Sequence, residues 1–510
     1  MTSTVTQTPV LICGSGPTGL TAALVLSRAG VSCRIVDRRT AASGLSRATG
    51  LNARSLELLD QLGVADRLLA AGFPLTKNSY LDGREVIGCD DLGVIDSDMP
   101  SLLAISEATI EDHMTSHLSD FGIRVERGVE VIGMDPHGEG PVTVRHADGR
   151  LADIDARWVV DAEGAHSTLR ERLDIHLIGE PVPGGWVAAD VITDSWPFDA
   201  ADTPNWLDAD VFWAQPLPGG AIRVFFRHDA DELTVRDVQA QVDARFPEPT
   251  TVLGVAQAGH FRLRHCVVES LARGSVFLAG DAAHQCSPVG GRGMNLGIQD
   301  AANIGWKLAV AGESTRPGVV LASYDAERRP VDADAIGAVA RSFARLADPE
   351  VDPDHRWSPA SPADSVRHND TSRDISTRYL DSPIIDYRDH RTDPAVPVGM
   401  RVPNAALSVA RDDDPSDLRS LLAVGGHVVL EIPDPRGVPA VAVDAAAGGS
   451  TAHPPAGGRL TVQDPDAELA RILTPGTYAI RPDGVLACAA PPGAYDRITD
   501  YFAVLGLESP

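Results

Sequence analysis

Paired cysteines, positive charge and long apolar runs are all scarce in this sequence. Its six cysteines are scattered over 510 residues with no CxxC pair, which argues against a disulfide framework and against a zinc site. Asp and Glu outnumber Lys and Arg by 71 to 44, and the net charge of −27 disfavours nucleic acid and anionic membranes as partners. No apolar stretch approaches the roughly 20 residues that cross a bilayer.

Several common catalytic motifs are also missing. The sequence contains no HExxH, GxxxxGKS/T or GxSxG pattern, so a zinc protease, a P-loop ATPase and a common serine hydrolase have no support. The apolar stretch from Val10 to Leu26 is interrupted by glycines and follows no basic residue, unlike a secretory signal. Unpaired thiols and the lack of a signal predict a cytoplasmic protein with reduced cysteines.

The pattern of the first 40 residues predicts the start of a nucleotide-binding sheet. An apolar strand, a glycine turn, a helix rich in Ala and Leu, and a second strand follow one another over residues 9–37, as in a βαβ unit. The apolar runs 156–161 and 275–279 predict further strands of the same sheet. This domain would therefore be discontinuous in the sequence.

The remaining segments predict two more domains. Residues 184–232 alternate apolar and polar side chains around a Pro-Gly-Gly turn, which predicts an inserted antiparallel sheet. Residues 295–345 carry a long helical pattern, and the polar, Pro- and Asp-rich stretch after it predicts a linker. Short apolar runs at 428–432 and 477–481, with a helical stretch between them, predict a small terminal α/β domain.

The glycine turn near the amino terminus has the sequence expected of a dinucleotide site. Residues 14–19 read GSGPTG, a GxGxxG motif between a strand and a helix. The first glycine permits the tight turn, the second lets the backbone approach a pyrophosphate, and the third allows close helix packing. A carboxylate at position 37 ends the next strand, where it can accept hydrogen bonds from a ribose. The motif assigns cofactor contacts to Gly14, Ser15, Gly16, Pro17, Gly19 and Asp37.

A long segment further along the chain resembles the FAD-dependent aromatic hydroxylases of the para-hydroxybenzoate hydroxylase type. Residues 280–308 read GDAAHQCSPVGGRGMNLGIQDAANIGWKL, and residues 46–57 and 323–330 match that family as well. Residues 379–383, 399–403 and 480–484 are similar to landmarks of the thioredoxin-like terminal domain of its polyketide and phenol hydroxylases. Without a CxxC pair, that domain would not be redox-active.

The resemblance implies an α/β fold of three domains. These are a Rossmann-like FAD-binding domain with a mixed sheet and helices, an inserted antiparallel-sheet substrate domain, and a thioredoxin-like C-terminal α/β domain. We place the FAD-binding domain at residues 1–180 and 266–345, and the substrate domain at residues 76–100 and 181–265. The linker would cover residues 346–398 and the terminal domain residues 399–510.

The activity that the resemblance implies is that of an FAD-dependent monooxygenase. NADPH or NADH would reduce FAD, O2 would form a flavin C4a-hydroperoxide, and this species would hydroxylate a bulky aromatic, such as a polyketide-type polycyclic phenol in antibiotic biosynthesis. The expected partners are the aromatic substrate and O2, and the protein would be a monomer or a homodimer. The same oxidant could instead carry out Baeyer–Villiger insertion, epoxidation or oxidative rearrangement. A non-catalytic protein that keeps the dinucleotide fold is a third alternative.

The resemblance also implies roles for residues outside the glycine turn. Asp281 corresponds to a residue that binds the ribityl chain, and amides of the loop 288–293 and the following helix would face the flavin N1 and C2 carbonyl. Glu107 stands where the family usually has glutamine, and Glu163 where it has aspartate, which leaves the handling of the nicotinamide open. The further FAD-site residues are Arg38, Arg47, Glu107, Val131, Asp281, Pro288, Gly291, Gly293, Met294 and Asn295.

The sequence assigns no catalytic base and no metal site. We expect His284 to be structural and Cys286 to contribute packing. The inserted domain holds aromatic residues that could line a substrate pocket or fill the core. They are Trp186, Trp206, Phe212, Trp213, Phe225 and Phe226, of which we assign Trp186, Trp213 and Phe225 to the substrate.

Overall fold

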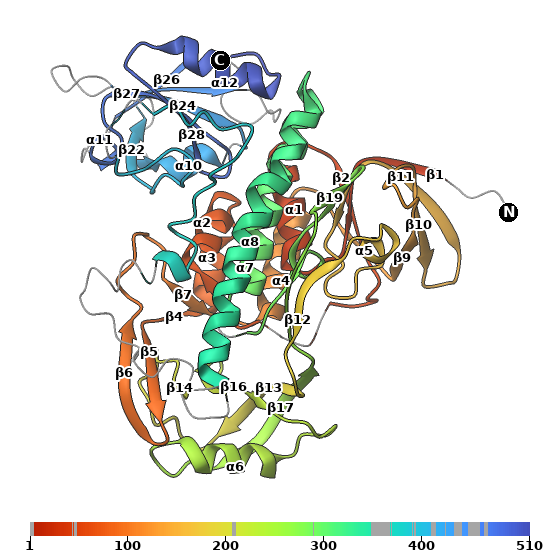
Figure 1. Ribbon diagram of the computed structural model, residues 1–510, viewed down its shortest axis with the longest axis vertical. Coiled ribbons are helices and arrows are strands. Elements are labelled where there is room, and N and C mark those ends of the chain that lie inside the picture. Colours follow the sequence, from red (N-terminus) through yellow and green to blue (C-terminus); the bar gives the residue numbers. More distant parts are fainter. Residues whose placement is uncertain are drawn as a thin grey trace.

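The computed structural model arranges the chain around one long helix, α8 (Pro317–Ala347). It describes residues 5–42, 44, 48–206, 211–288, 290–347, 368, 370–389, 391, 394–409, 415–423, 425–432, 441–446, 459–463 and 468–509. In Figure 1 the C-terminal part of the chain lies at one end of α8, a second sheet lies at the other end, and the N-terminal sheet lies beside the middle.

The N-terminal sheet is mixed, and most of its strands are parallel. The main path is β19 (Ala272–Arg273), β20 (Val276–Leu278), β11 (Leu151–Asp161), β1 (Val5–Cys13), β2 (Cys33–Asp37) and β8 (Val125–Arg127). Strand β10 (Val142–His146) pairs antiparallel with β11, and β9 (Val129–Gly133) pairs antiparallel with β10. Residues 10–13 of the central strand are fully buried, as expected when both faces of a parallel sheet are covered. The predicted α/β fold class is confirmed.

Helices cover this sheet and bring distant segments to its edge. They are α1 (Pro17–Arg28), α2 (Ala53–Gln61), α3 (Ala65–Ala71), α4 (Glu107–Asp120), α5 (Thr168–Arg172) and α7 (Gly293–Glu313). The helical pattern of residues 295–345 is divided into two helices, α7 and α8. Pro317 starts α8, as proline is favoured at the first position of a helix, and Ser314 after α7 is extended.

The second sheet has one face covered by a helix. Its spatial order is β17 (Val252–Phe261), β13 (Trp186–Thr193), β16 (Ile222–Arg227), β15 (Phe212–Pro216), β14 (Asn205–Trp206), β5 (Lys77–Asp82) and β6 (Glu85–Asp91). The pairings are antiparallel except that of β14 with β5, which is parallel. Helix α6 (Val235–Arg245) packs through Val238 and Val242 against an apolar cluster on one face of this sheet. On the opposite face, Trp186 packs against Phe343 of α8, with ring centroids 5.1 Å apart.

Two small sheets join these parts and position the loops between them. One consists of β3 (Gly50–Asn52), β7 (Leu102–Ala104) and β4 (Phe73–Leu75). The other consists of β12 (Leu177–Pro181), β18 (Arg264–Val268) and β21 (His284–Gln285), and a single 3-10 turn, η1 (Gly280–Ala282), precedes β21.

The described residues of the C-terminal part form a sheet of their own and three helices. The strand order is β23 (Pro415–Asp417), β22 (Ala406–Val409), β26 (Arg459–Gln463), β25 (Val441–Ala446), β24 (His427–Ile432), β27 (Gly476–Ile480) and β28 (Leu486–Ala490). The helices are α10 (Leu418–Leu422), α11 (Glu468–Ile472) and α12 (Tyr495–Leu505). Tyr379, Ile385 and Val398 from the predicted linker belong to its apolar core. The domain boundaries themselves stay predictions.

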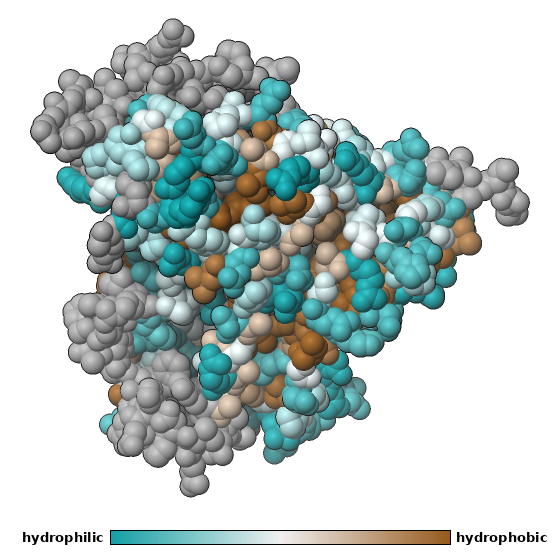
Figure 2. Space-filling model, turned by 45° about the horizontal axis from the view of Figure 1, so that its top comes forward, coloured by the Kyte–Doolittle hydropathy of each residue, from teal (hydrophilic) through white to brown (hydrophobic). Residues whose placement is uncertain are grey.

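The surface drawn in Figure 2 is mixed in polarity, and the cysteines are unpaired. On the face drawn in Figure 2, hydrophobic residues lie in separate patches among hydrophilic ones. No helix among the described residues is long and apolar enough to cross a membrane. The six cysteines are all free thiols.

Candidate functional site

The turn between β1 and α1 has the geometry of a dinucleotide cradle. Gly14 has φ +106°, and a Cβ there would overlap the carbonyl oxygen of Ala162. Helix α1 begins at Pro17, and no side chain forms a capping hydrogen bond with its first turn. Only the Glu111 carboxylate comes within 4 Å of a Cβ built on Gly16. A phosphate can therefore approach this backbone closely.

Asp37 lies at the end of β2, against this turn. Its Oδ2 accepts hydrogen bonds from the Ser15 amide at 2.9 Å and hydroxyl at 2.6 Å, and its Oδ1 accepts from the Arg39 amide at 2.7 Å. Burial alone would raise the pKa of Asp37, but the hydrogen bonds from Arg39 and Ser15 outweigh it and lower the pKa to about 2. Arg38 is exposed, and Arg127 donates to the Ser15 hydroxyl at 3.2 Å. Neither Arg39 nor Arg127 was predicted as a site residue from the sequence.

A second carboxyl, Glu111 on α4, is buried beside the same turn. Its Oε1 lies 3.6 Å from Nη2 of Arg39, whereas its Oε2 has no hydrogen-bond partner among the described residues. Burial raises the pKa of Glu111 to about 7, despite the attraction of Arg39. No motif marks this residue, because a single acid within a helix usually faces solvent.

Asp161 and Glu163 form a coupled acidic pair at the end of β11. The Glu163 carboxylate accepts from the amides of Thr168 and Leu169, each at 3.1 Å, so it caps α5. Burial raises the pKa of both carboxyl groups, and repulsion from Asp161 raises that of Glu163 further. The longer side chain of Glu163 thus turns toward the first turn of α5.

A second backbone cradle precedes α7. This helix begins at Gly293 with no side-chain cap on Arg292, and no atom lies within 4 Å of a Cβ built on Gly291. Asn295 holds the loop: its Nδ2 donates to the Gly291 carbonyl at 2.6 Å, and its Oδ1 accepts from the Asn52 amide of β3 at 2.9 Å. Open amides at a helix start favour a developing negative charge.

The other predicted cofactor residues lie in different surroundings, and their roles stay predictions. Asp281 is exposed on η1, and Met294 is partly buried in the first turn of α7. Glu107 begins α4 and accepts from the Ala48 amide at 3.1 Å. The Val131 side chain, on β9, belongs to the apolar core. Arg47 lies outside the described residues, as does position 289 in the segment between Pro288 and Gly293.

Behind the second cradle lies a fully buried ionic network. Asp300 accepts from His284 Nε2 at 2.8 Å, from Arg328 Nε at 2.8 Å and from the Gly280 amide at 3.1 Å. Burial would lower the pKa of His284, but Asp300 and Asp332 outweigh it and raise the pKa to about 9. Arg328 also donates to Asp332 at 2.7 Å and so supplies the positive charge that these carboxylates need. The network fixes the start of η1.

The second sheet sorts its aromatic residues between two faces. Trp206, Phe212 and Phe226 pack toward α6. Trp186, Trp213 and Phe225 lie on the opposite face, with ring centroids 5.4 Å apart for Trp186 and Phe225 and 5.9 Å apart for Trp213 and Phe225.

The face that holds Trp213 is joined to the FAD side of the molecule. Gln215, two residues further along β15, donates to the Thr49 carbonyl at 2.8 Å, next to β3. On the neighbouring strands of this face, Arg223 forms a buried ion pair with Asp190. This face of the sheet therefore holds buried aromatic rings beside polar groups.

One further charged side chain comes from the predicted linker. Arg373 is buried, and its Nη1 donates to the Gly290 carbonyl at 3.4 Å. Its Nε has no hydrogen-bond partner among the described residues. Burial lowers the pKa of Arg373, while Tyr80 of β5 and Asp90 of β6 oppose that shift. Sequence analysis missed this residue because nothing local distinguishes it within a polar stretch.

Comparison with known proteins connects both cradles to one family. The FAD binding domain family matches residues 7–338, a range that includes both glycine-rich turns. This chain belongs to that family. Its residues fit FAD, because two uncapped helix starts within one domain can receive the pyrophosphate and the flavin of the same molecule.

Curated relatives of this FAD-binding chain are monooxygenases. The 6-methylpretetramide 4-monooxygenase of Streptomyces rimosus is 34% identical over 66% of this chain and 62% of its own length. The pentachlorophenol 4-monooxygenase of Sphingobium chlorophenolicum is 31% identical over 63% of this chain and 62% of its own length. The FAD-binding chain thus spans less than two thirds of these relatives.

A solved structure shares the fold over nearly the entire chain. The flavin-dependent monooxygenase PieE, in complex with FAD and substrate, superimposes with a TM-score of 0.79 over 98% of this chain and 99% of that one. The sequences are 21% identical, so this likeness shows the fold of the FAD-binding protein.

Proposed function

We propose that this protein is an FAD-dependent monooxygenase that uses NADPH or NADH and O2 to hydroxylate a bulky aromatic substrate. The observation that carries the proposal is the contact of Gln215 with Thr49. This contact brings the aromatic face of the second sheet against the domain that contains both FAD cradles. The names of the curated relatives, which act on 6-methylpretetramide and pentachlorophenol, agree with an aromatic substrate.

The protein itself binds and orients FAD and the substrate, and it excludes water from them. Bound FAD, once reduced by the nicotinamide, supplies the chemistry that activates O2 and delivers one oxygen atom. The amides of the first cradle bind the pyrophosphate, and those at the start of α7 stabilise negative charge on the ring. Trp186, Trp213 and Phe225 exclude water from the face where the aromatic substrate lies.

Arg373 supplies a positive charge to the proposed substrate site. Hydroxylation needs an electron-rich ring, and a phenol becomes electron-rich when it loses its proton. A buried guanidinium with an unpartnered Nε favours an anion nearby, because an opposite charge stabilises the ionised form of a phenol. We assign Arg373 to the phenolate of the substrate, and the polar border around Asp190 and Arg223 to its other oxygen substituents.

One experiment tests the proposal. The purified protein is incubated with FAD, each nicotinamide cofactor and a panel of polycyclic phenols, while cofactor oxidation and substrate mass are followed. We expect substrate-dependent cofactor oxidation and a product that gains one oxygen atom with its ring skeleton intact. A product of altered connectivity would support oxygen insertion or rearrangement instead. A colourless protein that takes up no FAD would refute both.

A further inference from the structure

Asp374 lies outside the part of the chain that matches the FAD-binding family, yet it reaches the second FAD cradle. Its side chain is fully buried. The carboxylate accepts from Asn52 Nδ2 at 2.9 Å and from Gln299 Nε2 at 3.0 Å, and it forms an ion pair with Arg292. These donors come from the start of α2, from α7 and from the loop before α7.

The backbone at this position is unusual. Asp374 has φ +65°, and Asp174 is the only other non-glycine residue with a positive φ among the described residues. A side chain makes this conformation unfavourable, so the surrounding contacts must stabilise it. Asp174 is exposed, whereas Asp374 is buried among three donors, so the contacts of Asp374 determine its conformation.

The two neighbours Arg373 and Asp374 hold the cradle loop at two points. Arg373 donates to the carbonyl of Gly290, and Asp374 binds the side chain of Arg292. Asn295 binds the carbonyl of Gly291 between them. Each of these three consecutive loop residues therefore has a hydrogen-bond partner. Two of the partners, Arg373 and Asp374, are neighbours more than 80 residues away in the sequence.

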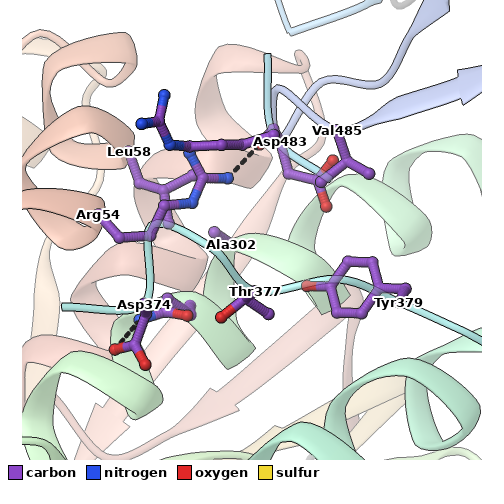
Figure 3. Close-up of a pocket in the computed structure, with 10 residues that line it drawn as sticks. Arg54, Leu58, Ala302, Asp374, Thr377, Tyr379, Asp483 and Val485 are labelled. Carbon is purple, nitrogen blue, oxygen red and sulfur yellow. Dashed lines mark hydrogen bonds between the residues drawn. The ribbon is translucent and has the colours of Figure 1, made fainter. Parts of the chain in front are cut away.

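The same segment is anchored in the C-terminal domain. Figure 3 shows a small cavity lined by Asp374, Thr377 and Tyr379 from one segment of the predicted linker, by Arg54 on α2, and by Asp483 from the C-terminal domain. The cavity measures about 20 Å³, which is room for about one water molecule. Tyr379 belongs to the apolar core of that domain, so the position of Asp374 depends on how that domain packs.

We propose that Asp374 is a positioning residue for FAD. Its carboxylate orients the Arg292 side chain and balances its charge. In this way it keeps the amides of the loop 290–293 in place for the flavin ring and sets the electric field that the ring experiences. The proposal rests on the FAD site of the proposed function and is independent of the substrate. No other ionic contact to Arg292 is found among the described residues.

Reduction potentials distinguish this role from a merely structural one. Reduced flavin carries more negative charge than oxidised flavin, so a more positive surrounding raises its potential. We expect Asp374→Asn, which leaves the Arg292 charge unbalanced, to shift the potential of bound FAD in the positive direction. Arg292→Gln should shift it in the negative direction, and the double variant should return close to the wild-type potential. FAD affinity should fall about tenfold in each single variant, as for one lost charge-assisted hydrogen bond.

The matched control is Asp174→Asn, which makes the same replacement at the other positive φ without a buried ion pair. It should leave the potential and the FAD affinity unchanged. The proposal is overturned if Asp374→Asn behaves like the control, or if both single variants shift the potential in the same direction without compensation. If Asp374→Asn does not fold, Arg292→Gln alone decides, since an unchanged potential there also overturns it. Failure of the wild-type protein to bind FAD would instead refute the proposed function.

Discussion

Replacing Glu327 by glutamine should detach the C-terminal domain from α7 and α8. The Glu327 carboxylate is fully buried at this junction. It accepts from Lys307 Nζ at 2.7 Å, from both Nη atoms of Arg481 at 2.8 and 2.9 Å, and from the Ser382 hydroxyl at 2.5 Å. Burial alone would raise the pKa of Glu327, but Arg481 and Lys307 lower it to about 2. The carboxylate therefore stays charged at neutral pH.

The expected cost follows from the loss of one partner in a buried ion pair. Glu327→Gln leaves the Arg481 guanidinium facing a neutral amide whose NH2 group is itself a donor, and such a loss destabilises by about 3–5 kcal/mol. Lys307→Met is the matched control. Burial lowers the pKa of Lys307 to about 7, despite Glu327, so its ammonium is already partly neutral, and a similar-sized apolar side chain should cost about 1.5 kcal/mol or less.

Denaturant unfolding followed by tryptophan fluorescence measures both variants. Trp306 donates its indole N–H to Asp483 at 3.1 Å across the same junction, so its emission reports separation of the two parts. Because a chain of several domains need not unfold in one step, the midpoint of this transition is compared rather than a global free energy. Between pH 7 and 10.5 the Lys307 side chain is protonated in the unfolded chain but largely neutral in the folded protein. The stability of the wild type should therefore rise with pH over this range, and this rise should vanish in Lys307→Met.

Equal losses in the two variants would refute this reasoning. They would mean that the polar cluster acts as one packed unit, and that the charge on Glu327 is not what joins the domains. An unchanged midpoint in Glu327→Gln would do the same.

Three further perturbations test the site. Gly14→Ala should abolish FAD binding, since its Cβ would overlap the Ala162 carbonyl. Gly122→Ala, also at positive φ but in open space, should retain the yellow colour of bound FAD. A yellow Gly14→Ala protein would contradict the role of this turn in FAD binding. The FAD affinity of the wild type should fall as the pH rises through about 7, because ionised Glu111 repels the pyrophosphate, and titrations of Glu111→Gln should show no such fall. Arg373→Met should slow hydroxylation about a hundredfold and remove the phenolate absorbance of bound substrate, while Arg373→Lys restores part of both; normal absorbance in Arg373→Met would exclude the assigned role.

The glycine turn could be predicted from the sequence because its geometry is local. Gly14 at positive φ, the strand before it and the helix after it lie within about 30 residues, and short-range steric rules determine them. The loop before α7 was predictable for the same reason. Alternation in the second sheet also predicted two faces, but not which of them α6 would cover.

Charged partners that are distant in the sequence could not be predicted from local patterns. Glu111 and Arg39 are ordinary surface residues by sequence, and their meeting at the turn depends on how α4 packs. Asp374 and Arg292 are 82 residues apart, and Arg481 and Glu327 are 154 apart. No periodicity or motif connects such pairs.

The amino-acid sequence by itself determined the chemistry of the backbone: where glycines open a turn, where a helix begins, and which strand carries an acid at its end. Only the tertiary structure decided which charged groups face one another without water. That difference has one physical cause. Local conformation depends on neighbouring residues, whereas the pKa and the energy of a buried charge depend on whatever the folded chain brings within a few ångströms of it.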